Sequence, residues 1–227
     1  MHIAGLQKSS LIDYPEKIAC IIFTQGCNFR CGYCHSPELF EQREPLISTE
    51  AFFEFLKTRQ NKLDGVVITG GEPTLQKDLE DFISEIKNLG FLIKLDSNGT
   101  NPNIIENFIK ENLIDYVAMD IKAPLYKYEQ ITNTKVETEN IKKSINLILN
   151  SNIDYEFRTT VIKSQLSYND FDEIGKLING AKNYYLQKFI PSKILDENLM
   201  SEMTYSDKEF EEIKQILSKY IQKIEIR

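Results

Sequence analysis

The sequence lacks a long apolar run. No segment approaches the ~18 consecutive apolar residues of a membrane-spanning helix, which excludes the usual class of membrane protein. The opening residues, MHIAG, also lack the charged start and the long apolar stretch of a secretory signal. We therefore expect a cytoplasmic protein with no membrane partner.

Positive charge is in short supply as well. Lys and Arg together number 27 against 34 Asp and Glu, which gives a formal net charge of −7. This balance argues against the broad basic surface that binds nucleic acid. It favours a protein or a small molecule as the partner.

The chain also lacks internal repeats, low-complexity tracts and linkers, so we expect one domain over residues 1–227. Short β-branched runs predict strands at 17–24, 65–69, 91–95, 116–121, 155–162 and 184–189, with a weaker candidate at 221–226. Amphipathic stretches between them predict helices at 49–62, 77–89, 103–112, 139–150, 169–178 and 206–220.

This alternation predicts an α/β fold with a parallel sheet and right-handed crossovers. A complete eight-unit barrel typically needs ~250 residues, whereas about six β/α units fit this chain. The expected architecture is therefore an incomplete (β/α)6 barrel similar to a TIM barrel. In such folds, sites form at the C-terminal ends of the strands.

Cysteine is scarce, and its placement is informative. Four cysteines are too few for a disulfide scaffold in a chain of this length. Cys27, Cys31 and Cys34 follow the first predicted strand with the spacing C-x-x-x-C-x-x-C, which indicates a metal site. Cys20 lies inside an apolar strand, where we expect it to serve as a small buried hydrophobic residue.

Three thiolates on one loop favour an iron–sulfur cluster. A complete protein cage for a [4Fe–4S] cluster takes four thiolates, so a cluster held by three keeps one iron open to a substrate or cofactor. The alternative is a zinc site made of the same cysteines and His35. Structural zinc sites usually combine ligand pairs that are distant in sequence, and four ligands within nine residues would strain the tetrahedron. We expect His35 to be a hydrogen-bonded loop residue instead.

Other motifs fall at the ends of predicted strands. In the segment Gly70-Gly71-Glu72, the two glycines have no side chains, so the backbone of this segment can approach a ligand closely. The alternative is that the segment forms an ordinary strand-to-helix turn. Asp96-Ser97 and Asp120 to Lys122 end the next two strands, so parallel strands would bring them to one rim. Arg158 lies among apolar neighbours and needs a carboxylate partner, which is either a ligand or an internal acidic residue.

These motifs, together with Tyr33 before the third cysteine, resemble the radical S-adenosylmethionine (SAM) superfamily along the whole chain. The resemblance implies that Cys27, Cys31 and Cys34 bind a [4Fe–4S] cluster and that the amino and carboxylate groups of SAM chelate the open iron. It also implies that Tyr33 lies near the adenine, with plain core packing as the alternative.

The same resemblance assigns the remaining SAM contacts. It implies that the segment Gly70, Gly71 and Glu72 holds the amino group of SAM and that Arg158 pairs with its carboxylate. Gln187 is expected at the ribose or adenine. Contacts with SAM are implied for the strand-end residues Asp96, Ser97, Asp120 and Lys122, and the acidic oxygens among them are expected to be able to hold a monovalent cation.

Three further stretches, at 5–15, 23–37 and 185–191, resemble activating proteins of anaerobic ribonucleotide reductases. Such proteins cleave SAM reductively to a 5′-deoxyadenosyl radical and abstract hydrogen from a glycine of a glycyl radical enzyme. The expected partners are therefore an anaerobic ribonucleotide reductase and, because the chain has cysteines for one cluster only, a flavodoxin or ferredoxin as reductant. An open cluster implies life in low oxygen.

Two alternatives remain. One is a radical SAM enzyme that acts on a small molecule, similar to carboxy-deazaguanine synthases; those usually have an aspartate after the third cysteine, where this chain has His35. The other is a non-catalytic iron–sulfur electron carrier or a zinc-stabilised binding module. Carriers need four protein ligands for each cluster, and this loop offers three.

Overall fold

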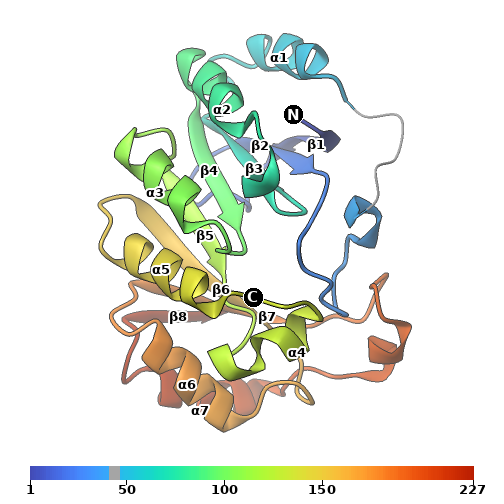
Figure 1. Ribbon diagram of the computed structural model, residues 1–227, viewed down its shortest axis with the longest axis vertical. Coiled ribbons are helices and arrows are strands. Elements are labelled where there is room, and N and C mark those ends of the chain that lie inside the picture. The colour runs from blue at the N-terminus through green and yellow to red at the C-terminus, as the bar shows by residue number, and fades with distance from the viewer. Residues whose placement is uncertain (41–46) are drawn as a thin grey trace.

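Eight strands form one sheet in which the strands follow each other in chain order (Figure 1). The computed structural model describes residues 1–40 and 47–227. Strand β1 pairs antiparallel with β2, and every later pair is parallel. The strands are β1 Ile3–Ser10, β2 Ala19–Thr24, β3 Gly65–Gly70, β4 Leu92–Ser97, β5 Tyr116–Asp120, β6 Asp154–Val161, β7 Asn183–Lys188 and β8 Lys223–Ile226.

Helices connect the parallel strands and cover the outer face of the curled sheet (Figure 1). They are α1 Thr49–Lys57, α2 Leu79–Asn88, α3 Pro102–Lys110, α4 Tyr128–Thr132, α5 Thr138–Leu149, α6 Tyr168–Leu177 and α7 Asp207–Leu217. Six β/α units followed by β8 result, which confirms the predicted α/β fold and the incomplete barrel. No helix within 1–40 and 47–227 is both long and apolar enough to cross a membrane.

Local sequence explains where the helices begin and end. Ser48 accepts a hydrogen bond from the Ala51 amide and caps α1. Gly90 has a φ of +90° directly after α2, as expected for a residue that ends a helix. The predicted helix at 49–62 was too long, because the chain leaves α1 at Lys57 and Asn61 takes a left-handed φ of +63°.

Strand β1 and the short helix α4 were not predicted. Of the eight residues of β1, only Ile3 and Ser10 are buried, so this strand has no alternating apolar pattern. It is held by pairing with β2 at the edge of the sheet. Helix α4 has five residues, which is too short for a helical period to show.

The two faces of the sheet have different roles. Outward-facing residues, including Cys20 and Ile22 of β2, join the large core beneath the helices. Inward-facing residues, including Ile21 of β2 and Ala118 of β5, form a small second cluster inside the barrel. Cys20 is fully buried, which confirms that it packs as a hydrophobic residue. Toward the C-terminal ends of the strands, the inward-facing residues become polar, and this change creates the site.

Candidate functional site

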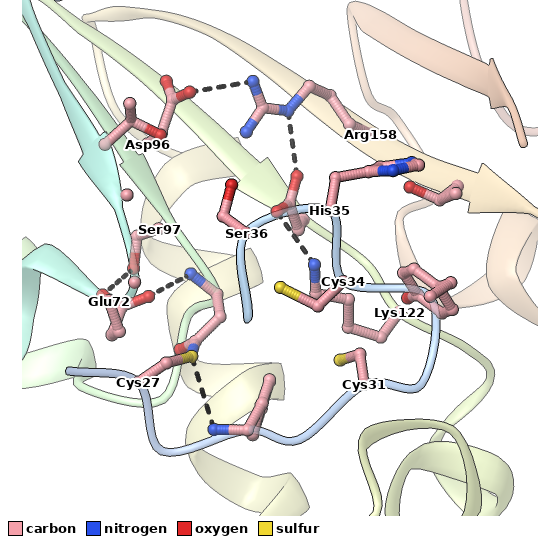
Figure 2. Close-up of a pocket in the computed structure, with 18 of the residues that line it drawn as sticks. Cys27, Cys31, Cys34, His35, Ser36, Glu72, Asp96, Ser97, Lys122 and Arg158 are labelled. Carbon is pink, nitrogen blue, oxygen red and sulfur yellow. Dashed lines mark hydrogen bonds and ion pairs between the residues drawn. The ribbon is translucent and has the colours of Figure 1, made fainter. Parts of the chain in front are cut away.

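A pocket opens at the C-terminal ends of β3 to β6, beneath the loop that follows β2 (Figure 2). Its empty space is about 810 Å³ including the part open to solvent, within the range of ligand pockets in proteins. The structure brings together there nearly all of the residues predicted for the site: Cys27, Cys31, Tyr33, Cys34, Gly70, Gly71, Glu72, Asp96, Ser97, Asp120, Lys122 and Arg158. Gln187 is not among the lining residues. It pairs in the sheet with Thr160, and Thr160 does line the pocket.

The three cysteines lie along one loop and border the pocket together (Figure 2). Cys31 is buried, and Cys27 and Cys34 are half-buried. Burial raises the pKa of the Cys27 thiol to about 11 and also raises the pKa of Cys31. These thiols therefore keep their protons at neutral pH until a metal replaces them. Three free thiols facing one pocket fit the ligand set of a cluster with an open iron.

The described residues contain no preformed site for a single zinc ion. A mononuclear zinc site needs its ligands to converge on one point. In the part of the chain that the structure describes, no three His, Cys, Asp or Glu side chains converge in that way. A [4Fe–4S] cluster binds its cysteines through separate irons, so its ligands need not converge. Three cysteines that face one pocket without converging on one point are compatible with a cluster.

Backbone contacts fix the position of the cysteine loop. The Gly26 amide donates to the Leu39 carbonyl at 2.8 Å, and the Glu72 amide donates to the Gly26 carbonyl at 2.8 Å. The loop after β3 approaches so closely that a Cβ on Gly71 would lie 2.0 Å from the Gly26 oxygen. Any side chain at Gly71 would push the two loops apart. The glycine pair of this motif is therefore required by loop packing, whether or not a ligand approaches it.

Glu72 is buried and accepts hydrogen bonds from three residues in two segments, its own loop and the end of β4 (Figure 2). The Thr74 amide and hydroxyl donate at 3.1 and 2.5 Å, the Ser97 hydroxyl at 2.9 Å and the Asn98 amide at 2.6 Å. Burial raises the pKa of Glu72, against the lowering effect of these bonds. The Glu72 carboxylate thus orders the loop after β4. Because that carboxylate is already hydrogen-bonded, the part of the Gly70-Gly71-Glu72 motif that can contact a ligand is its backbone.

Asn98 and Asn28 were not among the predicted site residues, because neither occupies a defining position of a motif that was singled out in the sequence. The Asn98 amide group donates to the Asn28 side-chain oxygen at 2.8 Å, and Asn28 donates to the Thr100 hydroxyl at 2.9 Å. These contacts tie the cysteine loop to the loop after β4. No pattern in the sequence could have paired two asparagines that are 70 residues apart.

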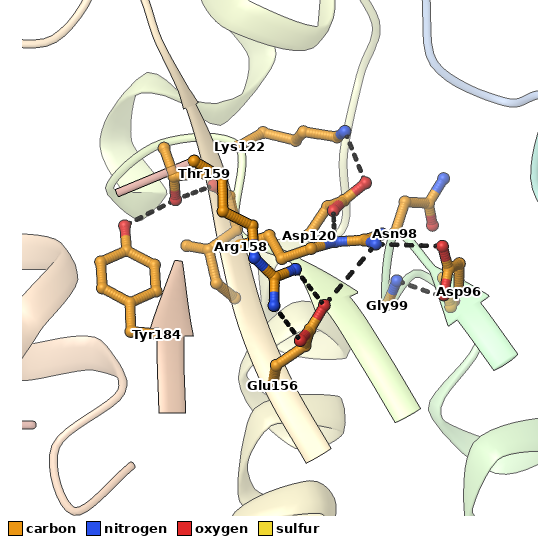
Figure 3. Close-up of polar contacts among 12 residues, drawn as sticks. Asp96, Asn98, Gly99, Asp120, Lys122, Glu156, Arg158, Thr159 and Tyr184 are labelled. Atoms are coloured by element: carbon orange, nitrogen blue, oxygen red, sulfur yellow. Dashed lines mark hydrogen bonds and ion pairs between the residues drawn. The ribbon is translucent and has the colours of Figure 1, made fainter. Parts of the chain in front are cut away.

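A charged network crosses the floor of the pocket (Figure 3). Arg158 donates through Nε to Asp120 at 2.9 Å and through Nη1 to Asp96 at 3.0 Å. Lys94 donates to Asp96 at 2.6 Å, and Lys122 donates to Asp120 at 3.0 Å. Lys94 was not singled out in the sequence, because a lysine in a strand usually faces water; here it is 2% exposed inside the barrel.

The charges of this network stabilise one another. Burial alone would raise the pKa of Asp120, but Arg158 and Lys122 outweigh it and hold the pKa at about 2. The pKa of Asp96 is likewise lowered, since Arg158 and Lys94 overcome the effect of burial. Both carboxylates are therefore ionised at neutral pH. The internal salt bridge considered for Arg158 is present, and its Nη2 donates to no residue within 1–40 and 47–227.

Two aromatic residues flank the cysteines. Tyr33 is buried, with Lys122 Nζ 6.0 Å from its ring centroid. Its buried hydroxyl lies near the Cys31 sulfur. His35 Nδ1 lies 3.1 Å from the Ser192 hydroxyl, and its ring stacks on Phe189. His35 is therefore hydrogen-bonded in its loop, as expected.

Comparisons with known proteins agree with this geometry. The family model of the radical SAM superfamily matches residues 21–178. A protein of Methanocaldococcus jannaschii, provisionally named a glycyl-radical enzyme activating enzyme, is 36% identical over 99% of this chain and 95% of its own length. A second protein of that organism, with the same provisional name, is 29% identical over 95% of this chain and 82% of its own.

Two solved structures show the same fold. A radical SAM methyltransferase from Sphaerobacter thermophilus superposes with a TM-score of 0.70 at 15% identity, over 94% of this chain and 66% of that one. A domain of a pyruvate-formate lyase-activating enzyme from Bacteroides vulgatus superposes with a TM-score of 0.57 at 17% identity, over 72% of this chain and 98% of that one. At these identities the likeness concerns the fold alone.

Proposed function

The chain belongs to the radical SAM superfamily, and on that premise we propose that it is a glycyl-radical enzyme activating enzyme whose [4Fe–4S] cluster is bound by Cys27, Cys31 and Cys34. One observation carries the proposal: three free cysteines on one loop line the same pocket as the polar ends of four parallel strands. A pocket of this kind can place a cofactor on an open iron and hold the rest of it against fixed polar groups.

The chemistry that a bound cluster and SAM supply is one-electron cleavage of a carbon–sulfur bond, which yields methionine and a 5′-deoxyadenosyl radical. The protein binds and orients. Arg158 Nη2 is available to a carboxylate, and the backbone at Gly70 and Gly71 is available to an amino group. Tyr33 is the proposed adenine contact, and Gln187 would reach the ribose or adenine from the neighbouring strand.

The proposed substrate is a glycine in a partner protein, and the proposed partner is an anaerobic ribonucleotide reductase. The provisional names of the two relatives from M. jannaschii support a glycyl radical enzyme as the substrate, and the match covers nearly the whole of both chains for the first of them. The choice of a ribonucleotide reductase rests on the resemblance of the stretches at 5–15, 23–37 and 185–191. A flavodoxin or ferredoxin is the proposed reductant, since the only cysteine outside the loop, Cys20, is buried in the core.

The first experiment tests SAM cleavage. Anaerobic reconstitution with iron and sulfide, followed by dithionite and SAM, should release 5′-deoxyadenosine, detected by chromatography. Cys31→Ala should abolish the product, whereas the matched control Cys20→Ala should retain it, because Cys20 lies outside the pocket. Iron binding without cleavage would favour the electron-carrier alternative. Binding of zinc alone would contradict the proposal.

The second experiment tests the partner. Incubation of the reduced enzyme and SAM with an anaerobic ribonucleotide reductase from the same organism should produce a glycyl radical signal in electron paramagnetic resonance. The signal should be absent when Cys31→Ala replaces the enzyme. A small-molecule product formed without any partner protein would instead support the deazaguanine-type alternative.

A further inference from the structure

Asp96 and Asp120 are the carboxylates that the family resemblance assigns to a monovalent cation, and both line the pocket. Each of their four oxygens already has a cationic nitrogen of this chain within 3.0 Å. For Asp96 these are Lys94 Nζ at 2.6 Å and Arg158 Nη1 at 3.0 Å. For Asp120 they are Arg158 Nε at 2.9 Å and Lys122 Nζ at 3.0 Å. Every oxygen of the two carboxylates is thus paired with a cationic group of the chain itself, and the contacts of Arg158 and Lys122 are drawn in Figure 3.

The charges point the same way. Three cationic side chains meet two carboxylates, so the five groups carry one net positive charge, and a further cation would be repelled. Glu156 lies 3.9 Å from Arg158, but it is itself paired with Arg227. Hard cations also need several oxygen ligands at once. In this network the acidic oxygens accept from Lys94, Arg158 and Lys122 instead.

Arg158 has the shape to take the place of such an ion. A guanidinium presents five N–H donors in one plane, so it can bridge two carboxylates through one edge and keep donors for a third. Here Nε and Nη1 bridge Asp120 and Asp96, and the side chain of Arg158 is 14% exposed. Its Nη2 remains available to a ligand.

We propose that the Arg158 guanidinium occupies the position of a monovalent cation between Asp96 and Asp120, so that this enzyme binds SAM without sodium or potassium. The part concerning SAM rests on the proposed function above. The part concerning the pairing of Arg158 with the two carboxylates depends on the contacts within the protein and can be tested without cluster or SAM. Arg158 thus pairs with both carboxylates of the pocket floor and also receives the carboxylate of the ligand.

Thermal unfolding of the apoprotein tests the second part separately. Wild type should give the same Tm in potassium, sodium and tetramethylammonium chloride at equal ionic strength. Arg158→Gln removes the bridging charge, so its Tm should fall in tetramethylammonium and recover by roughly 2–4 °C in sodium or potassium, if the ion restores about 1 kcal/mol. The control Lys176→Gln removes a surface charge and should respond to no cation.

The SAM part is tested by equilibrium binding to the reconstituted enzyme in the same three salts. The SAM affinity of wild type should be equal in all of them. A tenfold or larger loss in tetramethylammonium would overturn the proposal, and so would an Arg158→Gln protein whose Tm ignores the cation. If that variant does not fold, wild-type binding in the three salts still decides. Absence of SAM binding in every salt would count against the proposed function, while the apoprotein result would stand.

Discussion

Glu72 is the acceptor around which the loops of the pocket are ordered. A glutamine at this position would turn an NH2 group toward donors that now face a carboxylate oxygen. Hydrogen bonds to charged groups contribute about 1.5–3 kcal/mol each, so Glu72→Gln should lower the free energy of unfolding by about 2–4 kcal/mol. Urea denaturation measures this loss. Ser97→Ala is the matched control, since it removes one donor to this carboxylate and should cost about 1.5 kcal/mol. Equal losses in the two variants would contradict the role assigned to Glu72.

Asp170 gives a residue-scale prediction of pH dependence. It is 1% exposed at the start of α6, where it accepts from the Ser167 amide and hydroxyl at 2.7 Å and from Lys127 at 2.8 Å. Burial would raise its pKa, but these donors and the Tyr126 hydroxyl outweigh burial and hold the pKa at about 2. Because the pKa of Asp170 is lower in the folded state than in the unfolded state, its charge stabilises the folded protein at pH values above the ordinary aspartate pKa. This stabilisation is lost as the pH falls toward 2.

Asp170→Asn should therefore be less stable than wild type by about 2 kcal/mol at pH 7. The difference should shrink between pH 4 and pH 2, because the wild-type carboxylate becomes protonated there. Urea unfolding at a series of pH values measures it. A difference that stays constant down to pH 2 would show that the carboxylate charge is not the stabilising feature.

Residues of the site divide into two groups by how far their roles could be predicted. The cysteines form a spaced motif, and Glu72, Asp96 and Asp120 stand at strand ends. Arg158 is a charge among apolar neighbours inside β6, and all of these patterns are local in sequence. Lys94, Asn28 and Asn98 acquire their roles only when the sheet curls and distant loops meet. Their contacts join segments that meet only in the tertiary structure. The sequence alone therefore could not indicate the roles of these three residues.

The strands and helices of the barrel could be predicted from the sequence where their side chains are buried on one face or on both. The parallel strands are apolar runs and the helices have apolar stripes, so both patterns appeared in the sequence. Strand β1 lies at the edge with most of its side chains partly exposed, and α4 is a single short turn. For such elements stability comes from pairing with a neighbour, which leaves no periodic signal.

Gly175 in α6 allows a prediction at the scale of packed elements. A Cβ there would lie 2.4 Å from Cδ2 of Tyr220, which follows α7. Replacing glycine by alanine within a helix usually gains about 1 kcal/mol, but overpacking typically costs about 1–3 kcal/mol. Gly175→Ala should therefore destabilise the protein in urea unfolding.

The matched control is the same change in a Tyr220→Ala background. With the ring removed, Gly175→Ala should become stabilising by up to about 1 kcal/mol relative to Tyr220→Ala alone, because only the helix propensity remains. The sign of the effect is the critical observation. If Gly175→Ala has the same sign in both backgrounds, contact with Tyr220 does not explain why α6 carries a glycine.

At the scale of the whole molecule, the cysteine loop is held by a segment from the other end of the chain. Between β7 and α7, the Leu195 amide donates to the Cys34 carbonyl at 3.1 Å and the Asp196 amide donates to the Gly32 carbonyl at 2.9 Å. Lys193 pairs with Glu38 at 2.8 Å. A Cβ on Gly32 would lie 3.0 Å from Leu199 Cδ1, so the two segments are in close contact. Order in the cysteine loop is thus coupled to order in residues 192–199.

This coupling predicts where the loss of the cluster would be felt. Ligands that bind only the folded loop stabilise it, and local opening is reported by amide hydrogen exchange. Removing iron with a chelator under anaerobic conditions should speed exchange at the Leu195 and Asp196 amides by about tenfold, if the cluster stabilises the loop by about 1.4 kcal/mol. Amides within β5 and β6 should not change, because they lie in the ladder of the sheet.

Cys31→Ala provides the control, since a protein that cannot hold the cluster should show fast exchange at Leu195 and Asp196 with or without iron. Should these two amides be protected equally in the loaded and stripped wild-type protein, the hydrogen bonds to Cys34 and Gly32 would not depend on the cluster. The segment would then be ordered by its own packing. If removal of the iron speeds exchange only in the cysteine loop and in residues 192–199, the cluster organises both segments. They lie about 160 residues apart in sequence and are joined by two backbone hydrogen bonds.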